Sequence, residues 1–157
     1  MKVSDILRVK GGTLYTTFPD ASLAEAVETM AQFDIGSLAV MEHGELVGML
    51  TFREVLHTVA RNGGTVGSNT VRSVMDDHPM SCTPETELDA VRPLMLEKHT
   101  RYMPVMDSKM LMGVISFYDV AKAVVDAQNF ENKMLKAYIR DWPEEEEPRA
   151  ESEQKQA

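Results

Sequence analysis

The chain has 157 residues and a mass of 17.6 kDa, the size of one ordinary domain or of two very small ones, and can bury a core without covalent staples. Its net charge of −9 argues against a general nucleic-acid binder, and more than half of that charge lies in the acidic segment 141–157. A single cysteine excludes an intrachain disulfide, no apolar run is long enough to span a membrane, and the first residues lack a signal-peptide pattern. We therefore expect a cytoplasmic protein without membrane contact.

The first predicted elements are a strand over 14–17 and, after a proline turn, a helix that Ser22 and Glu25 open as a capping box. Two apolar runs, 38–41 and 46–50, flank a polar turn and predict a hairpin. A second helix is expected directly after the hairpin, over 52–61. The glycine-rich stretch 63–70 is typical of a linker.

The same order of elements recurs about 65 residues later. The sequence predicts a strand over 81–83, a helix from Leu88 that Pro93 should kink or shift, a hairpin of 102–106 and 110–115, and a helix over 117–127. Segment 16–55 aligns with 81–120 without a gap, and Val3–Leu7 echoes Val71–Met75 at an offset of 68.

This repeat predicts two half-domains, 1–62 and 71–128, joined by the linker and followed by a C-terminal helix and an acidic tail over 129–157. Each half is too small for a private core, so we expect the two to pack sheet to sheet as one pseudo-symmetric α/β (α+β) unit. A duplicated half-domain also creates clefts between its halves, where ligands often bind.

Each predicted hairpin meets its second helix in a string of the same chemistry. Thr51 to Glu54 and Ser116 to Asp119 both carry a hydroxyl followed three residues later by a carboxylate. Such a string can be a capping box that only starts a helix. It can also hold a nucleotide, because the helix start and the hydroxyl suit a phosphate and the carboxylate can accept hydrogen bonds from ribose. Arg53 and Arg101 could supply charge to the phosphate.

In this order and spacing, the strings 3–7, 35–40, 48–54, 71–75, 97–105 and 113–119 resemble the tandem CBS (cystathionine β-synthase) domain, or Bateman module, especially small stand-alone bacterial CBS-pair proteins. The resemblance implies two βαββα repeats packed through their sheets, with N- and C-terminal helices. It implies clefts that bind AMP, ADP or ATP, and in some members NAD or S-adenosylmethionine. It further implies a disc-like homodimer and a separate effector protein.

The resemblance also implies the site residues. The favoured site, in the second repeat, would be formed by Cys82, Thr83, Arg101, Tyr102, Met103, Pro104, Val105, Ser116 and Asp119. The first-repeat site would be formed by Thr16, Thr17, Ile35, Gly36, Ser37, Leu38, Ala39, Thr51, Arg53 and Glu54. We rank this site second because Glu54 stands where the family usually has aspartate.

No nucleophile–base pair, metal cluster or phosphate loop is evident, so we expect neither catalysis, nor a catalytic cofactor, nor a metal. Cys82 and the histidines fit no zinc signature, and Cys82 is expected to pack in a strand. Two alternatives stay open: a dimeric interaction scaffold with degenerate nucleotide sites, and an enzyme acting on a phosphate. On the C-terminal helix, an apolar stripe either docks on its own domain or makes a dimer contact; its residues are Phe130, Met134, Leu135 and Tyr138.

Overall fold

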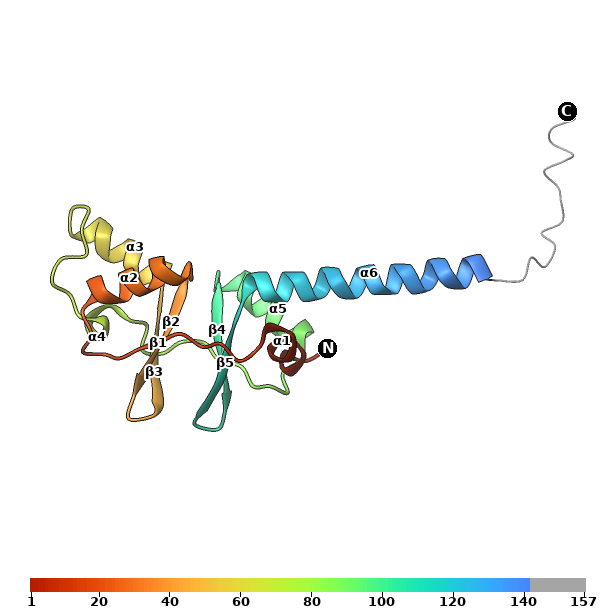
Figure 1. Ribbon diagram of the computed structural model, residues 1–157, viewed down its shortest axis with the longest axis horizontal. Coiled ribbons are helices and arrows are strands. Elements are labelled where there is room, and N and C mark those ends of the chain that lie inside the picture. The colour runs from red at the N-terminus through yellow and green to blue at the C-terminus, as the bar shows by residue number, and fades with distance from the viewer. Residues whose placement is uncertain (142–157) are drawn as a thin grey trace, which may run out of the picture. The chain divides into compact units, whose positions relative to one another are not determined.

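The computed structural model describes residues 1–141 (Figure 1). The predicted acidic tail lies outside the described residues, as do Trp142 and Pro143, at which the sequence predicts the end of the last helix. The chain divides into two compact parts, 1–121 and 122 onward. Over residues 1–141, no helix combines the length and the apolar character needed to cross a bilayer.

The first repeat forms as the apolar pattern predicts. Its elements are β1 (Thr16–Thr17), α2 (Leu23–Phe33), β2 (Ser37–Glu42), β3 (Glu45–Thr51) and α3 (Phe52–Arg61). β1 runs parallel to β2, and β2 runs antiparallel to β3. The hairpin turns at His43 and Gly44, which both have positive φ, the geometry of a tight two-residue turn. Ser22 Oγ accepts a hydrogen bond from the Glu25 amide at 3.1 Å, so one half of the predicted capping box is present.

The second repeat differs from its prediction in two places, the strand over 81–83 and the helices after the hairpin. It comprises α5 (Leu88–Glu97), β4 (Tyr102–Asp107), β5 (Met110–Ser116) and α6 (Phe117–Asp141). The strand expected over 81–83 is reduced to one bridge, between Cys82 and Val105. α5 runs through Pro93, so the proline does not shift its start. The helices expected over 117–127 and 130–139 are one continuous helix, because no glycine or proline separates them.

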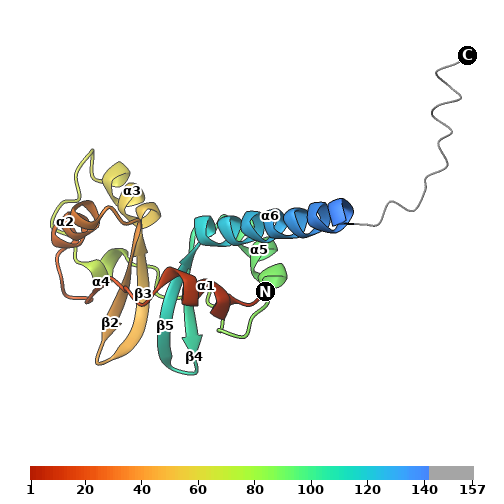
Figure 2. The same cartoon turned by 45° about the vertical axis from the view of Figure 1, so that its right-hand side comes forward.

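The two sheets meet through β3 and β5, which contact each other (Figure 2). The core of the first repeat includes the fully buried side chains Leu23, Leu38 and Leu50. In the second repeat, Met95, Met103 and Ile115 are similarly buried. The predicted architecture of two α/β repeats that pack through their sheets is therefore confirmed.

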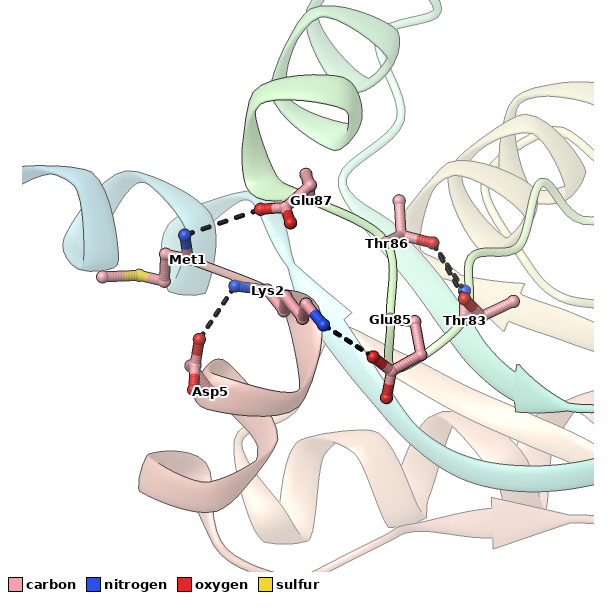
Figure 3. A network of polar contacts seen from close by, with 7 residues as sticks. All are labelled: Met1, Lys2, Asp5, Thr83, Glu85, Thr86 and Glu87. Carbon is pink, nitrogen blue, oxygen red and sulfur yellow. Dashed lines mark hydrogen bonds and ion pairs between the residues drawn. The ribbon is translucent and has the colours of Figure 1, made fainter.

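The N-terminal helix α1 (Val3–Lys10) packs on the second repeat, although it precedes the first in sequence. The Val3 amide donates to the Thr86 carbonyl at 2.9 Å. Lys2 Nζ lies 2.8 Å from Glu85 Oε2, and the N-terminal amine pairs with Glu87 at 3.6 Å (Figure 3). α1 is thus anchored to the segment that leads into α5.

The short helix α4 (Val71–Val74) packs on the first repeat in turn. The Val71 amide donates to the Ala21 carbonyl at 2.9 Å, and the Val71 side chain belongs to the core of the first repeat. Arg72 pairs with Glu42 through a hydrogen bond of 2.6 Å. The helix before each repeat therefore packs on the other repeat, an exchange that decides which residues reach each candidate site.

From Lys122 onward, the described residues of the second part form the rest of α6. Lys122 and Asp126 form an ion pair at 3.4 Å. The predicted apolar stripe is exposed, since Phe130, Met134 and Leu135 each keep more than half of their surface accessible.

Candidate ligand-binding site

Two hollows lie where the hairpins meet their second helices. The Ser116 cavity, of about 780 Å³, is lined by Lys10, Thr13, Leu14, Tyr15, Asp34, Ile35, Gly36, Ser37, Arg101, Tyr102, Val114, Ser116, Phe117 and Tyr118. The Thr51 cavity, of about 340 Å³, is lined by Met49, Thr51, Phe52, Arg53, Glu54, Leu56, His57, Asp76, Pro79, Met80, His99, Thr100, Arg101 and Tyr102. Both volumes fall in the range of small-molecule sites.

Each cavity takes its walls from both halves of the chain. Segments 14–15 and 34–37 of the first half line the Ser116 cavity, and segments 79–80 and 99–102 of the second half line the Thr51 cavity. These segments correspond to one another at the 65-residue offset of the repeat. The two cavities are therefore equivalent positions of the duplicated fold, and each wall is supplied by the opposite repeat.

The structure brings together only some of the residues predicted for the second-repeat site. Arg101, Tyr102 and Ser116 line the Ser116 cavity, and Asp119 lies beside it in contact with Lys10. The linings of the two cavities do not include Cys82, Thr83, Met103, Pro104 or Val105. Thr83 is exposed and bonded to Thr86 (Figure 3), whereas the other four side chains are buried in the sheet region.

The residues predicted for the first-repeat site are divided between the cavities. Thr51, Arg53 and Glu54 line the Thr51 cavity, but Ile35, Gly36 and Ser37 line the Ser116 cavity. Neither of these two linings includes Thr16, Thr17, Leu38 or Ala39. Thr16 and Thr17 pair with β2, and Leu38 and Ala39 are buried in β2 itself. The division follows from the crossed walls, which a local sequence pattern does not show.

Ser116 and Asp119 form a complete capping box at the start of α6. The Ser116 amide donates to Asp119 Oδ2 at 2.8 Å, and the Asp119 amide donates to Ser116 Oγ at 3.0 Å. The Asp119 side chain is only 17 % exposed. The local sequence therefore holds the carboxylate in place at the cavity edge, as the capping interpretation predicts.

Lys10 is a residue of this site that the sequence did not indicate. Its ammonium lies 2.8 Å from Asp119 Oδ2 and also donates to the Val114 carbonyl at 2.8 Å. Within residues 1–141, no hydrogen bond reaches Asp119 Oδ1. Lys10 ends α1, so only the packing of α1 on the second repeat brings it here. Its isolated position in the sequence offered no signal.

Thr51 and Glu54 form the corresponding capping box at the start of α3. Glu54 Oε1 accepts from both the amide and the hydroxyl of Thr51, each at 2.8 Å. Burial raises the pKa of Glu54 above its usual value, the two bonds from Thr51 oppose that rise, nearby Asp76 adds to it, and Arg53 lowers the pKa. The longer side chain of glutamate therefore folds back on its own helix cap in a partly buried place.

The two cavities differ in the charge beside their carboxylates. Asp76 exchanges two backbone hydrogen bonds of 2.9 Å with Met49. Met49 corresponds to Val114 at the offset of 65, and the carbonyl of Val114 is the group that Lys10 bonds. A cation thus stands next to Asp119, whereas an acid stands next to Glu54. The carboxylate neighbour is the clearest chemical difference between the two sites.

Cys82 lies outside both cavities and is a packed core residue. It is 7 % exposed, and burial raises the pKa of its thiol to about 11. A thiol of that pKa is not a nucleophile near neutral pH. In the described part of the chain, no three histidine, cysteine, aspartate or glutamate side chains gather as metal ligands would.

Comparison with known proteins identifies the family to which this chain belongs. The CBS domain family matches the chain twice, over residues 3–61 and 71–126. Among curated relatives, the mitochondrial CBS domain-containing protein CBSX3 of Arabidopsis thaliana is 31 % identical over 147 residues, which cover 88 % of this chain and 71 % of the relative. The CBS domain-containing protein YhcV of Bacillus subtilis (strain 168) is 34 % identical over 107 residues, 68 % of this chain and 75 % of the relative.

Solved structures agree in fold with this chain. The CBS-domain protein ATU1752 from Agrobacterium tumefaciens has a TM-score of 0.74 at 31 % identity, over 78 % of this chain and 98 % of that one. A CBS-domain protein from Burkholderia ambifaria MC40-6 has a TM-score of 0.75 at 28 % identity, over 82 % and 96 % of the two chains. The chain belongs to the CBS domain family, and its two halves form a tandem CBS pair.

Proposed function

We propose that this chain is a non-catalytic regulatory module that binds adenosine-containing ligands in its two cavities and transmits binding to another protein. The observation that carries the proposal is the hydroxyl–carboxylate pair at a helix start beside a hollow, present twice. A helix start attracts phosphate through its free amides and dipole, and a carboxylate accepts hydrogen bonds from ribose hydroxyls. The two groups needed for a nucleotide lie one helical turn apart.

Two solved structures of low sequence identity support only the general point that this fold can hold adenosine-containing ligands. The CBS domain pair of protein MJ0100, with a TM-score of 0.70, is solved in complex with 5′-methylthioadenosine and S-adenosyl-L-methionine. CBSX2, with a TM-score of 0.69, is solved in complex with AMP. Both are 22 % identical to this chain, so the proposed ligand class of AMP, ADP, ATP, NAD or S-adenosylmethionine rests on the residues described above.

Each cavity has a proposed division of roles. In the Ser116 cavity, Asp119 binds ribose, and Ser116 with Arg101 binds phosphate. In the Thr51 cavity, Glu54 and Thr51 take the same roles with Arg53. We assign the base to the wall segments 13–15 and 34–37 in one cavity and to the wall segments 79–80 and 99–102 in the other.

The proposed assembly is a homodimer in the cytoplasm that acts on an effector protein in trans. The exposed apolar stripe of α6, with Phe130, Met134 and Leu135, supports a contact between copies. Burial of such an apolar helix face against a partner is favourable, because it removes apolar surface from water. The proposed boundaries of the halves stay at 1–62 and 71–128.

A thermal-shift series with AMP, ADP, ATP, NAD and S-adenosylmethionine tests the function. A ligand at 100 times its dissociation constant should stabilise the fold by about 2.7 kcal/mol. Asp119→Ala should abolish or sharply weaken the shift. A wild-type chain that no adenosyl ligand stabilises would instead support the scaffold alternative, and formation of a new phosphate product in the same mixtures would support the enzyme alternative.

A further inference from the structure

Arg101 and Tyr102 border the Ser116 cavity and the Thr51 cavity alike. We infer that the guanidinium of Arg101 serves both cavities, in addition to Arg53 in the Thr51 cavity, so that an anionic ligand in one weakens the binding of an anionic ligand in the other. The inference rests on the proposed function and adds its regulation. Arg101 and Tyr102 belong to the wall between the two cavities.

This wall is built from two equivalent pairs of residues. At the offset of 65, Gly36 and Ser37 correspond to Arg101 and Tyr102. The backbones confirm the equivalence, because the amide after β3 donates to the Gly36 carbonyl at 3.1 Å and the amide after β5 donates to the Arg101 carbonyl at 2.7 Å. Ser37 pairs with the last residue of β3 just as Tyr102 pairs with the last residue of β5.

The pairs are unequal in size, and the small pair makes room for the large one. A Cβ atom on Gly36 would overlap the hydroxyl of Tyr102 and would lie 2.7 Å from Phe52 Cε2. The ring of Tyr102 therefore occupies space that any side chain at position 36 would need. An arginine at position 36 would therefore have to displace the ring of Tyr102 from its present place. Of the two equivalent pairs, only the one in the second repeat carries a guanidinium.

Unequal size also explains why one pair reaches both cavities. Arg101 and Tyr102 line the Thr51 cavity as the repeat predicts, since Gly36 and Ser37 line the Ser116 cavity in the same way. Arg101 and Tyr102 line the Ser116 cavity in addition, over the small residues opposite. The pKa of Tyr102 is raised, mainly by burial. Arg101 opposes this rise and Asp119 adds to it, as expected of a side chain that lies between those two charges.

The charge of Arg101 is available to a ligand. The residue is exposed, and within residues 1–141 it forms no ion pair. A guanidinium binds a phosphate bidentately through its planar fork, and it carries one positive charge. A first phosphate therefore takes its donors and neutralises its charge, and a second phosphate across the wall meets less attraction. Loss of one charge-assisted hydrogen bond weakens binding by about tenfold or more.

Calorimetric titration with AMP and with adenosine tests this inference, because adenosine lacks the phosphate. Asp119→Ala and Glu54→Ala give the affinity of each remaining cavity alone. In the wild type we expect the second AMP to bind about tenfold more weakly than AMP binds the same cavity in the single-cavity variant. Two adenosines should bind the wild type independently. Arg101→Met should make AMP binding independent too. Arg92→Met, which removes an exposed arginine outside both linings, should behave as the wild type.

Equal coupling for AMP and adenosine, coupling that survives Arg101→Met, or two independent AMP sites in the wild type would overturn the inference. A wild type that binds one AMP and two adenosines shows the same coupling in its extreme form, and one that binds one of each overturns it. If no adenosyl ligand binds the wild type at all, the proposed function fails, which separates that failure from a loss of coupling alone.

Discussion

Lys10→Met removes the cation that holds the carboxylate of the Ser116 cavity. The Lys10 ammonium bonds Asp119 Oδ2 at 2.8 Å, and the two side chains are 37 % and 17 % exposed. An ion pair that water screens to this extent contributes about 1 kcal/mol to the free energy of unfolding. Methionine keeps the apolar stem, so we expect the ligand-free variant to lose about that amount, a fall in Tm of about 2–4 °C for a chain of this size.

The same free energy opposes the binding of ribose. Asp119 Oδ2 already accepts bonds from the Ser116 amide and from Lys10, which leaves Oδ1 to a ligand. A ribose that bonds both oxygens must break the ion pair, at a cost of about 1 kcal/mol in the wild type and none in the variant. We therefore expect Lys10→Met to bind adenosine about fivefold more tightly, since 1.4 kcal/mol corresponds to a factor of ten.

Calorimetric titration with adenosine measures this gain, because a ligand without phosphate cannot use Lys10 as an extra cation. Lys2→Met is the matched control: it lies at the other end of the N-terminal segment and loses an ion pair of the same 2.8 Å length, to Glu85, outside the cavity (Figure 3). Adenosine should bind this control as it binds the wild type, and Asp119→Asn should remove the gain from Lys10→Met. Equal or weaker binding by Lys10→Met would show that Lys10 supports the site, and would refute the reasoning.

Three further outcomes follow from the structure. Because burial raises the pKa of Glu54 in the fold, the wild type should lose stability as the pH rises from the usual pKa of a glutamate toward the raised one. Glu54→Gln lacks this loss, so its Tm relative to that of the wild type should rise as the pH increases above 4.5. Gly36→Ala should destabilise by about 1–3 kcal/mol in denaturant titration, because the added Cβ meets Tyr102 and Phe52, and an unchanged midpoint would contradict the described wall. Cys82, with a thiol pKa of about 11, should react with a thiol reagent at neutral pH only as fast as the chain opens, and rapid labelling of the native protein would contradict its burial.

The regular elements of the repeats could be predicted because their signals are local. α3 begins and ends at the predicted residues, and both hairpins lie where apolar runs flank a polar turn. The prediction of a strand over 81–83 was wrong, because the backbone there makes one bridge, at Cys82, and not a ladder of hydrogen bonds. Local pattern shows that a segment can be extended, but pairing depends on the neighbour that the fold supplies.

The candidate site, too, could be predicted from the sequence only in part. The hydroxyl–carboxylate strings were predictable, since a capping box is a contact between residues three apart, and Ser116 with Asp119 forms one. The walls were not, because they depend on which repeat each segment packs against. Gly36 was expected beside Thr51 and lies in the lining of the other cavity. A repeat shows which residues are equivalent but leaves open which copy they face.

The difference between the two cavities has its origin in the length of two helices. α1 has eight residues and α4 has four, although both begin from equivalent strings. After α4 the chain turns and pairs the backbone of Asp76 with Met49. α1 continues instead, and the side chain of its last residue, Lys10, bonds the carbonyl of Val114 that corresponds to Met49. The extra turn of helix therefore replaces a backbone pairing by a lysine, and gives opposite charges to the neighbours of the two carboxylates, Asp119 and Glu54. Differences in ligand preference between the cavities should accordingly follow exchanges at positions 10 and 76 more closely than exchanges between Thr51 and Ser116.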